Sequence, residues 1–250
     1  MQLGKSELNA EFYGDISVSE ISSSFNLPIK FEKPVKGNEL IKELIDTPLK
    51  PFALAIQNTL KKASEHMKES NIKDLASFIV KTLQSGPQKK KAQNFINSII
   101  KFLPESMDDS CIYKDQRIAF HSKAQELVNE LHKQFSSKNK LFEFDDLDSL
   151  LPLCNSIQVA ALRHHGILIF SESLSKKIDL DCGLFSVGSS DEIEIRSFAF
   201  RACSLIVSLL REKKLVDRLN LTDFSLFLSH KFFSLESSQV KPHQIQTPYY

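Results

Sequence analysis

The spacing of apolar residues is the feature that most constrains this fold, because over most of the chain it follows the turn of an α-helix. Apolar side chains recur every three or four residues in five segments, at 52–67, 75–83, 95–103, 124–135 and 198–209. Only seven glycines and nine prolines interrupt the 250 residues. The pattern predicts an all-α, mostly helical single domain over residues 1–250, with at most a short β-hairpin.

The hairpin is expected at 111–120, CIYKDQRIAF, where β-forming residues and charges mix over too short a span for a larger sheet. We expect the helices around 124–135 and 191–211 to be the most buried. The predicted core residues are Ala124, Leu127, Leu131, Phe198, Leu205 and Leu209.

Charge and cysteine content exclude several classes of function. Thirty-two basic and 31 acidic residues give a formal charge of +1, so no global field attracts nucleic acid or membrane. The four cysteines lie far apart, without the spacing of a zinc site, which predicts reduced thiols, no metal and no cofactor. The chain has no signal-like start and no run of 18 apolar residues, so we expect a cytoplasmic protein.

Two charged runs leave alternatives open. Lys89, Lys90 and Lys91 open a helical segment and could form a phosphate site, although a solvated helix start is the simpler interpretation. The acidic stretch 143–148 could hold a cation, but it lacks the glycine and closing glutamate of a calcium loop. A solvated helix start stabilised by carboxylates is again simpler.

Two short motifs mark helix ends. The tight turn His164-His165-Gly166 could provide metal or acid–base chemistry, but neither histidine has a second ligand at metal spacing, so a structural turn is favoured. Ser189-x-x-Glu192 has the spacing of a capping box at the start of a helix. Glu194 and Arg196 follow within that first turn and a half, where an ion pair or support of the cap is the default role.

Three segments together resemble a known family. They are LCNSIQVAALRHHGILIFSESL at 153–174, GSSDEIEIR at 188–196, and the C-terminal DFSLFLSHKFFSLESSQVKPHQIQTPYY at 223–250. This combination is similar to the queuosine 5′-phosphate N-glycosylases, the queuosine-salvage enzymes that release the base queuine from its nucleotide for reuse in tRNA modification. The resemblance covers about the C-terminal two thirds of such a protein.

The resemblance can be followed residue by residue. The family's Phe-Ala-Asp corresponds to Leu153-Cys154-Asn155, so its aspartate is an asparagine here, while its Glu-Val-Glu-Ile-Arg is retained at 192–196. Its Asp-Tyr-Tyr-Leu-Trp is echoed by 223–227 and its Phe-Tyr-Lys-Arg-Ala-Gln by 120–125. The ending keeps a histidine, an isoleucine and two tyrosines but replaces both family arginines with glutamine, as seen at His243, Gln244, Ile245, Gln246, Tyr249 and Tyr250.

The resemblance implies a helical fold related to DNA glycosylases that holds one small-molecule nucleotide, rather than a nucleic acid duplex. Its implied catalytic residue is Asp223, whose carboxylate would stabilise an oxocarbenium-like sugar or orient water. Asn155 would recognise the base with one acceptor oxygen instead of two, and Lys123 would meet the 5′-phosphate or act as an ordinary lysine at a helix start. The substrate-binding residues implied in this way are Leu153, Cys154, Asn155, Lys123, Glu194, Arg196 and His243.

Family members carry an additional N-terminal region with aromatic residues that line the base pocket, and we expect this chain to lack roughly that N-terminal third. The pocket would then be open on one side unless a protein partner closes it. Three hypotheses follow: an N-glycosylase for queuosine 5′-phosphate, a catalytically impaired family member that binds a nucleotide or a protein, and a helical interaction module without a ligand. In the third, Lys89–Lys91 and the helices at 52–84 would form the contact surface.

Overall fold

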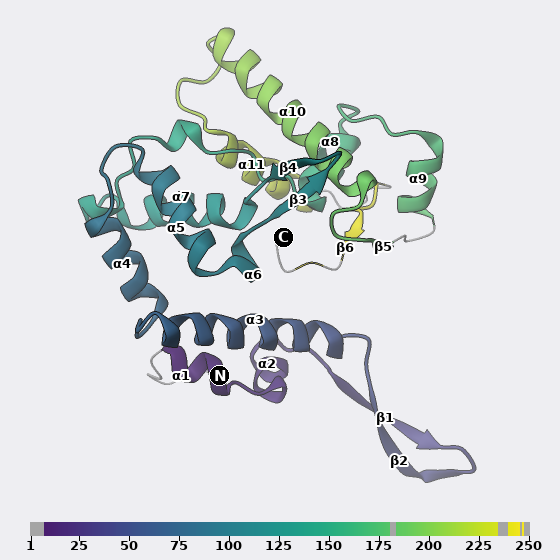
Figure 1. Cartoon of the computed structure of the whole chain (residues 1–250). Coiled ribbons are helices and arrows are strands. Elements are labelled where there is room, and N and C mark those ends of the chain that lie inside the picture. The colour runs from purple at the N-terminus through teal and green to yellow at the C-terminus, as the bar shows by residue number, and fades with distance from the viewer. Residues whose placement is uncertain (1–7, 181–183, 235–239, 246, 248–250) are drawn as a thin grey trace. The chain divides into compact units, whose positions relative to one another are not determined.

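The computed structural model describes residues 8–180, 184–234, 240–245 and 247, and it confirms the mostly helical fold (Figure 1). Helices account for 58% of the chain, and the strands form only small two-stranded sheets. The chain divides into two compact units, Met1–Lys81 and Thr82–Tyr250. The single-domain boundary of 1–250 stays a prediction.

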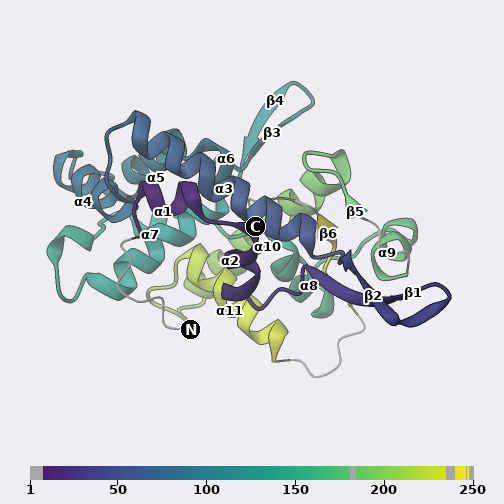
Figure 2. The same ribbon diagram turned by 90° about the horizontal axis from the view of Figure 1, so that it is seen from below.

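The first unit is built on one long helix. Its elements are α1 (Ala10–Asp15), α2 (Val18–Ser24), β1 (Lys30–Val35), β2 (Asn38–Asp46), α3 (Lys50–Glu69) and the first residues of α4 (Leu75–Ser85). Helix α1 lies along α3 in both views (Figures 1 and 2), and the Ser64 hydroxyl donates to the Ala10 carbonyl over 2.5 Å. A Cβ on Gly14 would lie 2.8 Å from the Ser64 Oγ, so a glycine is required for this close approach.

The β1–β2 hairpin was not predicted. Leu40, Ile41, Leu44 and Ile45 have the spacing of a helix face, yet they lie on a strand whose partner register pairs Ile45 with Phe31. A turn at 36–37, where Gly37 has a φ of +93°, reverses the chain. The turn at 36–37 therefore outweighs the helical spacing of these apolar residues.

The second unit contains the remaining elements. They are α5 (Lys91–Phe102), α6 (Pro104–Met107), β3 (Ser110–Tyr113), β4 (Gln116–Ala119), α7 (Ser122–Phe135), the 3₁₀ turns η1 (Lys140–Phe142) and η2 (Leu147–Ser149), α8 (Ser156–His164), α9 (Glu172–Asp179), β5 (Leu184–Phe185), α10 (Ser190–Glu212), α11 (Leu221–Phe233) and β6 (Gln244–Ile245). The β3–β4 hairpin occupies the predicted segment. The short parallel pair of β5 and β6 was not predicted, and it joins the C-terminal segment to the loop before α10.

Helices α8, α10 and α11 pack around the main core of this unit. Hydrogen bonds fasten the segment before α8 to α11: the Ser225 hydroxyl accepts from the Leu153 amide at 3.0 Å, and the Thr222 hydroxyl donates to the Leu151 carbonyl at 2.9 Å. The buried members of the core are Phe120, Cys154, Val159, Ala161, Leu162, Ile178, Phe185, Ile195, Ala199, Cys203, Val207, Phe224 and Leu228. None of the helices in the described ranges is both long and apolar enough to cross a bilayer.

Half of the predicted core was wrong, because α10 presents a different face to the core. Ala124 and Leu131 are buried as expected, and Leu127 is half-buried. On α10, however, Phe198, Leu205 and Leu209 are 64%, 45% and 51% exposed. The buried stripe is instead Ala199, Cys203 and Val207, whose small side chains let α10 pack closely against its neighbours. Because α10 carries apolar residues on both faces, the sequence does not show which face is buried.

This packing predicts opposite results for two adjacent residues of α10. Ala199→Leu should lower the free energy of unfolding by about 1–3 kcal/mol, because added methylenes have no space in a packed core. Phe198→Ala should change it by less than about 0.5 kcal/mol, because the ring is on the surface. Urea unfolding followed by circular dichroism measures both. A larger loss in Phe198→Ala than in Ala199→Leu would reverse the assignment of the buried face.

Candidate functional site

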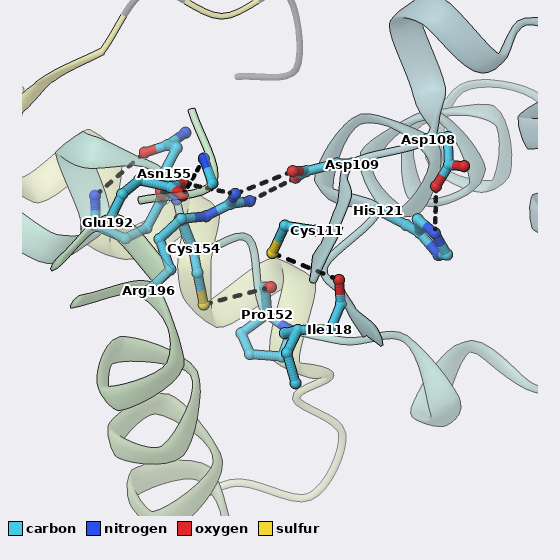
Figure 3. A network of polar contacts seen from close by, with 12 residues as sticks. Asp108, Asp109, Cys111, Ile118, His121, Pro152, Cys154, Asn155, Glu192 and Arg196 are labelled. Carbon is cyan, nitrogen blue, oxygen red and sulfur yellow. Dashed lines mark hydrogen bonds and ion pairs between the residues drawn. The ribbon is translucent and has the colours of Figure 1, made fainter. Parts of the chain in front are cut away.

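A buried ionic cluster lies where the β3–β4 hairpin, the start of α8 and the start of α10 meet. The guanidinium of Arg196 lies between the carboxylates of Asp109 and Glu192 (Figure 3), and all three residues are at most 5% exposed. Its Nη1 donates to Asp109 Oδ1 at 2.9 Å and to Glu192 Oε1 at 3.0 Å, and its Nη2 donates to Asp109 Oδ2. Its Nε donates to the Cys154 carbonyl at 2.9 Å. The cluster therefore joins three segments that are distant in the sequence.

Local sequence explains how the cluster is positioned. Ser189 caps α10 by accepting from the Glu192 amide, and Glu192 Oε2 accepts from the Gly188 amide at 3.2 Å, which fixes the glutamate one turn before Arg196. The Asp109 carbonyl accepts from the Phe120 amide, and the Phe120 ring lies 3.8 Å from the Arg196 guanidinium carbon. Since buried charges are tolerated only when they are paired and hydrogen-bonded, each partner depends on the others.

Sequence reasoning identified Arg196 but chose the wrong glutamate as its neighbour. Glu194 is exposed on the opposite side of α10, where its carboxylate accepts from the Tyr113 hydroxyl of β3. Glu192, seen in the sequence only as a helix cap, is the buried partner. Asp109 was missed because it lies 87 positions from Arg196 and carries no motif.

Asn155 is the N-cap of α8. Its Oδ1 accepts from the amides of Ile157 and Gln158 at 3.0 and 3.3 Å, and the Gln158 side chain accepts from the Asn155 amide in return. The predicted neighbours Leu153 and Cys154 are buried. Burial, with a smaller effect of Cys203, raises the pKa of the Cys154 thiol well above its usual value, so this sulfur stays protonated.

His243 is a buried histidine of the second unit. It is 3% exposed, and neither ring nitrogen has a hydrogen-bond partner within the described ranges. Its ring lies edge-on to Phe185, at a centroid distance of 5.9 Å. Burial, together with the positive charges of Arg196 and Arg163, lowers the pKa of His243 to about 4, so the imidazole is neutral near pH 7. Tyr249 and Tyr250 lie outside the described residues.

Asp223 belongs to the first turn of α11 and lies next to Lys133, near the C-terminal end of α7. Its carboxylate accepts from Lys133 Nζ at 2.5 Å, from Asn129 Nδ2 at 3.0 Å and from Asn220 Nδ2 at 3.0 Å. Its backbone amide donates to Asn220 Oδ1 at 2.7 Å, which caps the helix. The side chain is 31% exposed, so one carboxylate is held in a fixed orientation while water and solutes can still reach it.

Helix α7 carries two further charged side chains, Glu126 and Glu130, on the face that contacts Asp223. Glu126, Glu130 and Lys133 share one helix face with Asn129, at spacings of three and four residues. Burial and then Glu130 raise the pKa of the Glu126 carboxyl, while Lys123 and Lys133 oppose this effect. Burial lowers the pKa of the half-buried Lys123, and the carboxylates of Glu126 and Asp109 oppose it.

The predicted site residues therefore form two groups. Arg196, Cys154 and His243 lie around the ionic cluster. Lys123 belongs to the same group, because the carboxylate of Asp109 acts electrostatically on its ammonium. Asp223 lies with Lys133, ten residues and about 15 Å along α7 from Lys123. A cavity shared by Asp223 and Asn155 stays a prediction.

Within the described ranges, no group of three or more histidine, cysteine, aspartate or glutamate side chains is arranged to hold a metal ion. His164 and His165 are exposed, with their rings edge to face at the end of α8. The adjacent Gly166 has a φ of +69°, as the predicted tight turn requires. Three of the four cysteines lie in the described ranges and are free thiols, as predicted.

The model of a protein family described as "Queuosine salvage protein" matches residues 8–250. No curated protein matches the chain.

The neutral, buried His243 predicts a loss of stability in acid. Between pH 6.5 and about 4 the unfolded chain binds a proton that the folded state resists, so the contribution is complete above pH 6.5 and is lost as the pH falls through this range. The difference corresponds to roughly 3 kcal/mol at most. His243→Leu should reduce the acid dependence of the free energy of unfolding by up to that amount, as measured by urea unfolding from pH 7 to 4.

The exposed His165 provides the matched control, since His165→Leu should leave the acid dependence as it is in the wild type. An unchanged pH profile in His243→Leu would mean that His243 binds a proton as readily in the folded protein as in the unfolded chain.

Proposed function

Because this chain belongs to the queuosine salvage protein family, we propose that it hydrolyses the N-glycosidic bond of queuosine 5′-phosphate and releases queuine. Membership gives the chain a role in queuosine salvage, with a small nucleotide-like substrate. The hydrolysis itself, its residues and a cytoplasmic location are our proposal. The fixed Asp223 carboxylate is the observation on which it rests.

Hydrolysis of an N-glycosidic bond develops positive charge on the sugar as the base departs. A carboxylate held close to the anomeric carbon stabilises this charge without reorganising during the reaction. Asp223 fits this role because Lys133, Asn129 and Asn220 hold its two oxygens, while nearly a third of the side chain stays accessible. The same carboxylate could orient the attacking water.

The leaving base requires a proton. Glu126 is suited to donate it, because burial raises the pKa of its carboxyl and thereby favours the protonated form. It lies one turn before Asn129 and Glu130 on the α7 face that contacts Asp223. Glycoside hydrolysis commonly uses one carboxyl as the proton donor and a second carboxylate to stabilise the sugar.

The remaining roles concern binding. Lys123, three residues before Glu126, is proposed to meet the 5′-phosphate. Asn155 uses its Oδ1 as a helix cap, so the amide left to face the base is its Nδ2 donor, which has no partner among the described residues. Leu153, Cys154 and His243 would line the same region, and Arg196 would hold its wall in place. Glu194, which faces Tyr113, is the weakest of the proposed binding residues.

A second candidate is a family member that binds the nucleotide without hydrolysing it. Asn155 favours this reading, because it replaces a charged acceptor of the family and its only oxygen is occupied by the α8 cap. The Arg196 nitrogens favour it as well, since they donate to Asp109, Glu192 and the Cys154 carbonyl. These groups would shape a pocket and take no part in bond cleavage.

Asp223→Asn should reduce queuine release by a factor of about 100 or more, because it removes the negative charge that stabilises the transition state. The asparagine keeps one acceptor oxygen, so the ion pair with Lys133 and one of the two hydrogen bonds from Asn129 and Asn220 are lost, at a cost of about 1–3 kcal/mol. Incubation with queuosine 5′-phosphate and mass spectrometry of free queuine measures the rate.

The exposed Asp217 supplies the control, because Asp217→Asn makes the same chemical change on the surface outside the site. Glu126→Gln should lower the rate while leaving nucleotide binding intact. If Asp223→Asn releases queuine at the wild-type rate, the carboxylate has only a structural role as the acceptor for Lys133, Asn129 and Asn220, and the binding-only candidate is preferred.

Asn155→Asp tests the second candidate directly. An aspartate caps a helix as well as asparagine does, so the fold should be unaffected. It also restores a charged acceptor, whose hydrogen bond to the base is worth about 1.5–3 kcal/mol. Nucleotide affinity, measured by isothermal titration calorimetry, or queuine release should increase about ten-fold or more. No change in either quantity would place Asn155 outside the base-binding region.

A further inference from the structure

The second unit contains a cavity of about 750 Å³ to which none of the proposed catalytic and binding residues contributes. It lies where the start of α5 meets the end of α7 and the loop around η1. Its lining consists of Gln88, Lys91, His132, Ser136, Ser137, Lys140, Glu143, Phe144 and Asp145. The lysine run at 89–91 and the acidic run at 143–148, which the proposed function leaves unexplained, meet at this cavity.

Asp146 has a structural role beside the cavity. Its carboxylate accepts from the amides of Ala92 and Gln93 at 2.8 and 3.1 Å, and it thereby caps α5. The acidic run leads into the short 3₁₀ turn η2, so a helical turn does begin there, but the Asp146 carboxylate stabilises α5 rather than η2. These first amides of α5 are already satisfied, so any affinity of the cavity for an anion must come from side chains.

Lys91 is the unusual group of this cavity. The sequence predicted a solvated lysine, but Lys91 is only 6% exposed, and its ammonium lies 5.6 Å from the centre of the Phe144 ring, which lines the same cavity. Among the described residues its Nζ makes no hydrogen bond or ion pair. Burial lowers the pKa of Lys91, while the charges of Glu143 and Asp145 oppose this effect. A buried cation without a hydrogen bond or direct ion pair favours an anionic ligand.

Glu143 and Asp145 are exposed and flank Phe144 in the sequence. Neither carboxylate makes a hydrogen bond or ion pair with another residue in the described ranges, although both act electrostatically on Lys91. The exposed Lys140 adds a second positive charge to the lining. Both signs of charge therefore line one cavity without neutralising each other by direct contact.

We propose that this cavity binds a small zwitterionic ligand, one that carries an oxyanion paired with Lys91 and an amine directed to Glu143 and Asp145. Phe144 provides an apolar wall between the two ends, and the volume is within the range of small-molecule sites. The site is separate from Asp223: His132 lines the cavity and the adjacent Lys133 binds Asp223, but neighbouring helical residues point about 100° apart.

Wild-type protein can test the ligand class without any substitution. O-phosphoethanolamine carries both charges, whereas inorganic phosphate and ethanolamine carry one each. Isothermal titration calorimetry at low ionic strength should show at least ten-fold tighter binding of O-phosphoethanolamine than of either single-charge probe. Equal affinities, or no binding of O-phosphoethanolamine at millimolar concentration, would overturn the proposal.

Lys91→Met then tests the anchoring cation, because methionine retains a long apolar side chain over Phe144 but has no charge. Affinity for O-phosphoethanolamine should fall at least ten-fold. Lys101→Met, an exposed change on the same helix, should have no effect. Lys91→Arg keeps the charge and should bind O-phosphoethanolamine within about three-fold of the wild-type affinity. The thermal transition of Lys91→Met shows whether that variant folds, and Lys91→Arg is the variant to compare with the wild type if it does not.

The double variant Glu143→Gln with Asp145→Asn tests the other end of the ligand. It should weaken binding of O-phosphoethanolamine but not of phosphate, since only the amine contact is removed. Queuine release by these variants should match that of the wild type, so failure of the hydrolase proposal would leave the calorimetric result intact. Wild-type affinity in Lys91→Met would show that the Lys91 charge does not anchor the ligand. An equal loss of affinity in Lys91→Met and Lys91→Arg would show that the charge at this position is not what binds the ligand.

Discussion

The ion cluster of Arg196 with Asp109 and Glu192 is the interaction on which the second unit depends, because it joins three segments that are distant in the sequence through buried charges that cannot be left unpaired. Asp109 precedes the β3–β4 hairpin, the Cys154 carbonyl precedes α8, and Arg196 belongs to α10. Loss of either carboxylate would leave buried N–H groups of the guanidinium without their acceptors. The positions of the hairpin and of both helices are therefore coupled.

The core of α8, α10 and α11 completes this arrangement. Small residues on the inner face of α10 allow close packing, while hydrogen bonds from α11 to Leu151 and Leu153 hold the chain just before Asn155. Asp223 begins α11, so the same helix that fixes the segment before α8 also presents the carboxylate to α7. The proposed chemistry therefore depends on the packing of α11 against both α7 and the segment before α8.

Sequence alone predicted the helical class and most helices, because their apolar period is long and regular, and it placed the β3–β4 hairpin. It missed β1–β2, where Leu40 and Ile41 imitate a helix face, and it mistook the phase of α10, which is apolar on both sides. Resemblance led to Arg196 and Asn155 but not to Asp109 or Glu126, whose environments arise only from folding. Pairings between distant residues and the burial of single charges are not encoded in local pattern.

The cap at Asn155 has a consequence for how such a site can change over time. The oxygen that satisfies the first amides of α8 is present in both asparagine and aspartate, so the fold is nearly indifferent to which of them occupies this position. A single mutational step can therefore remove or restore the charge without passing through an unstable protein. Folding alone therefore does not select between asparagine and aspartate at position 155, and only the proposed contact with the base would do so.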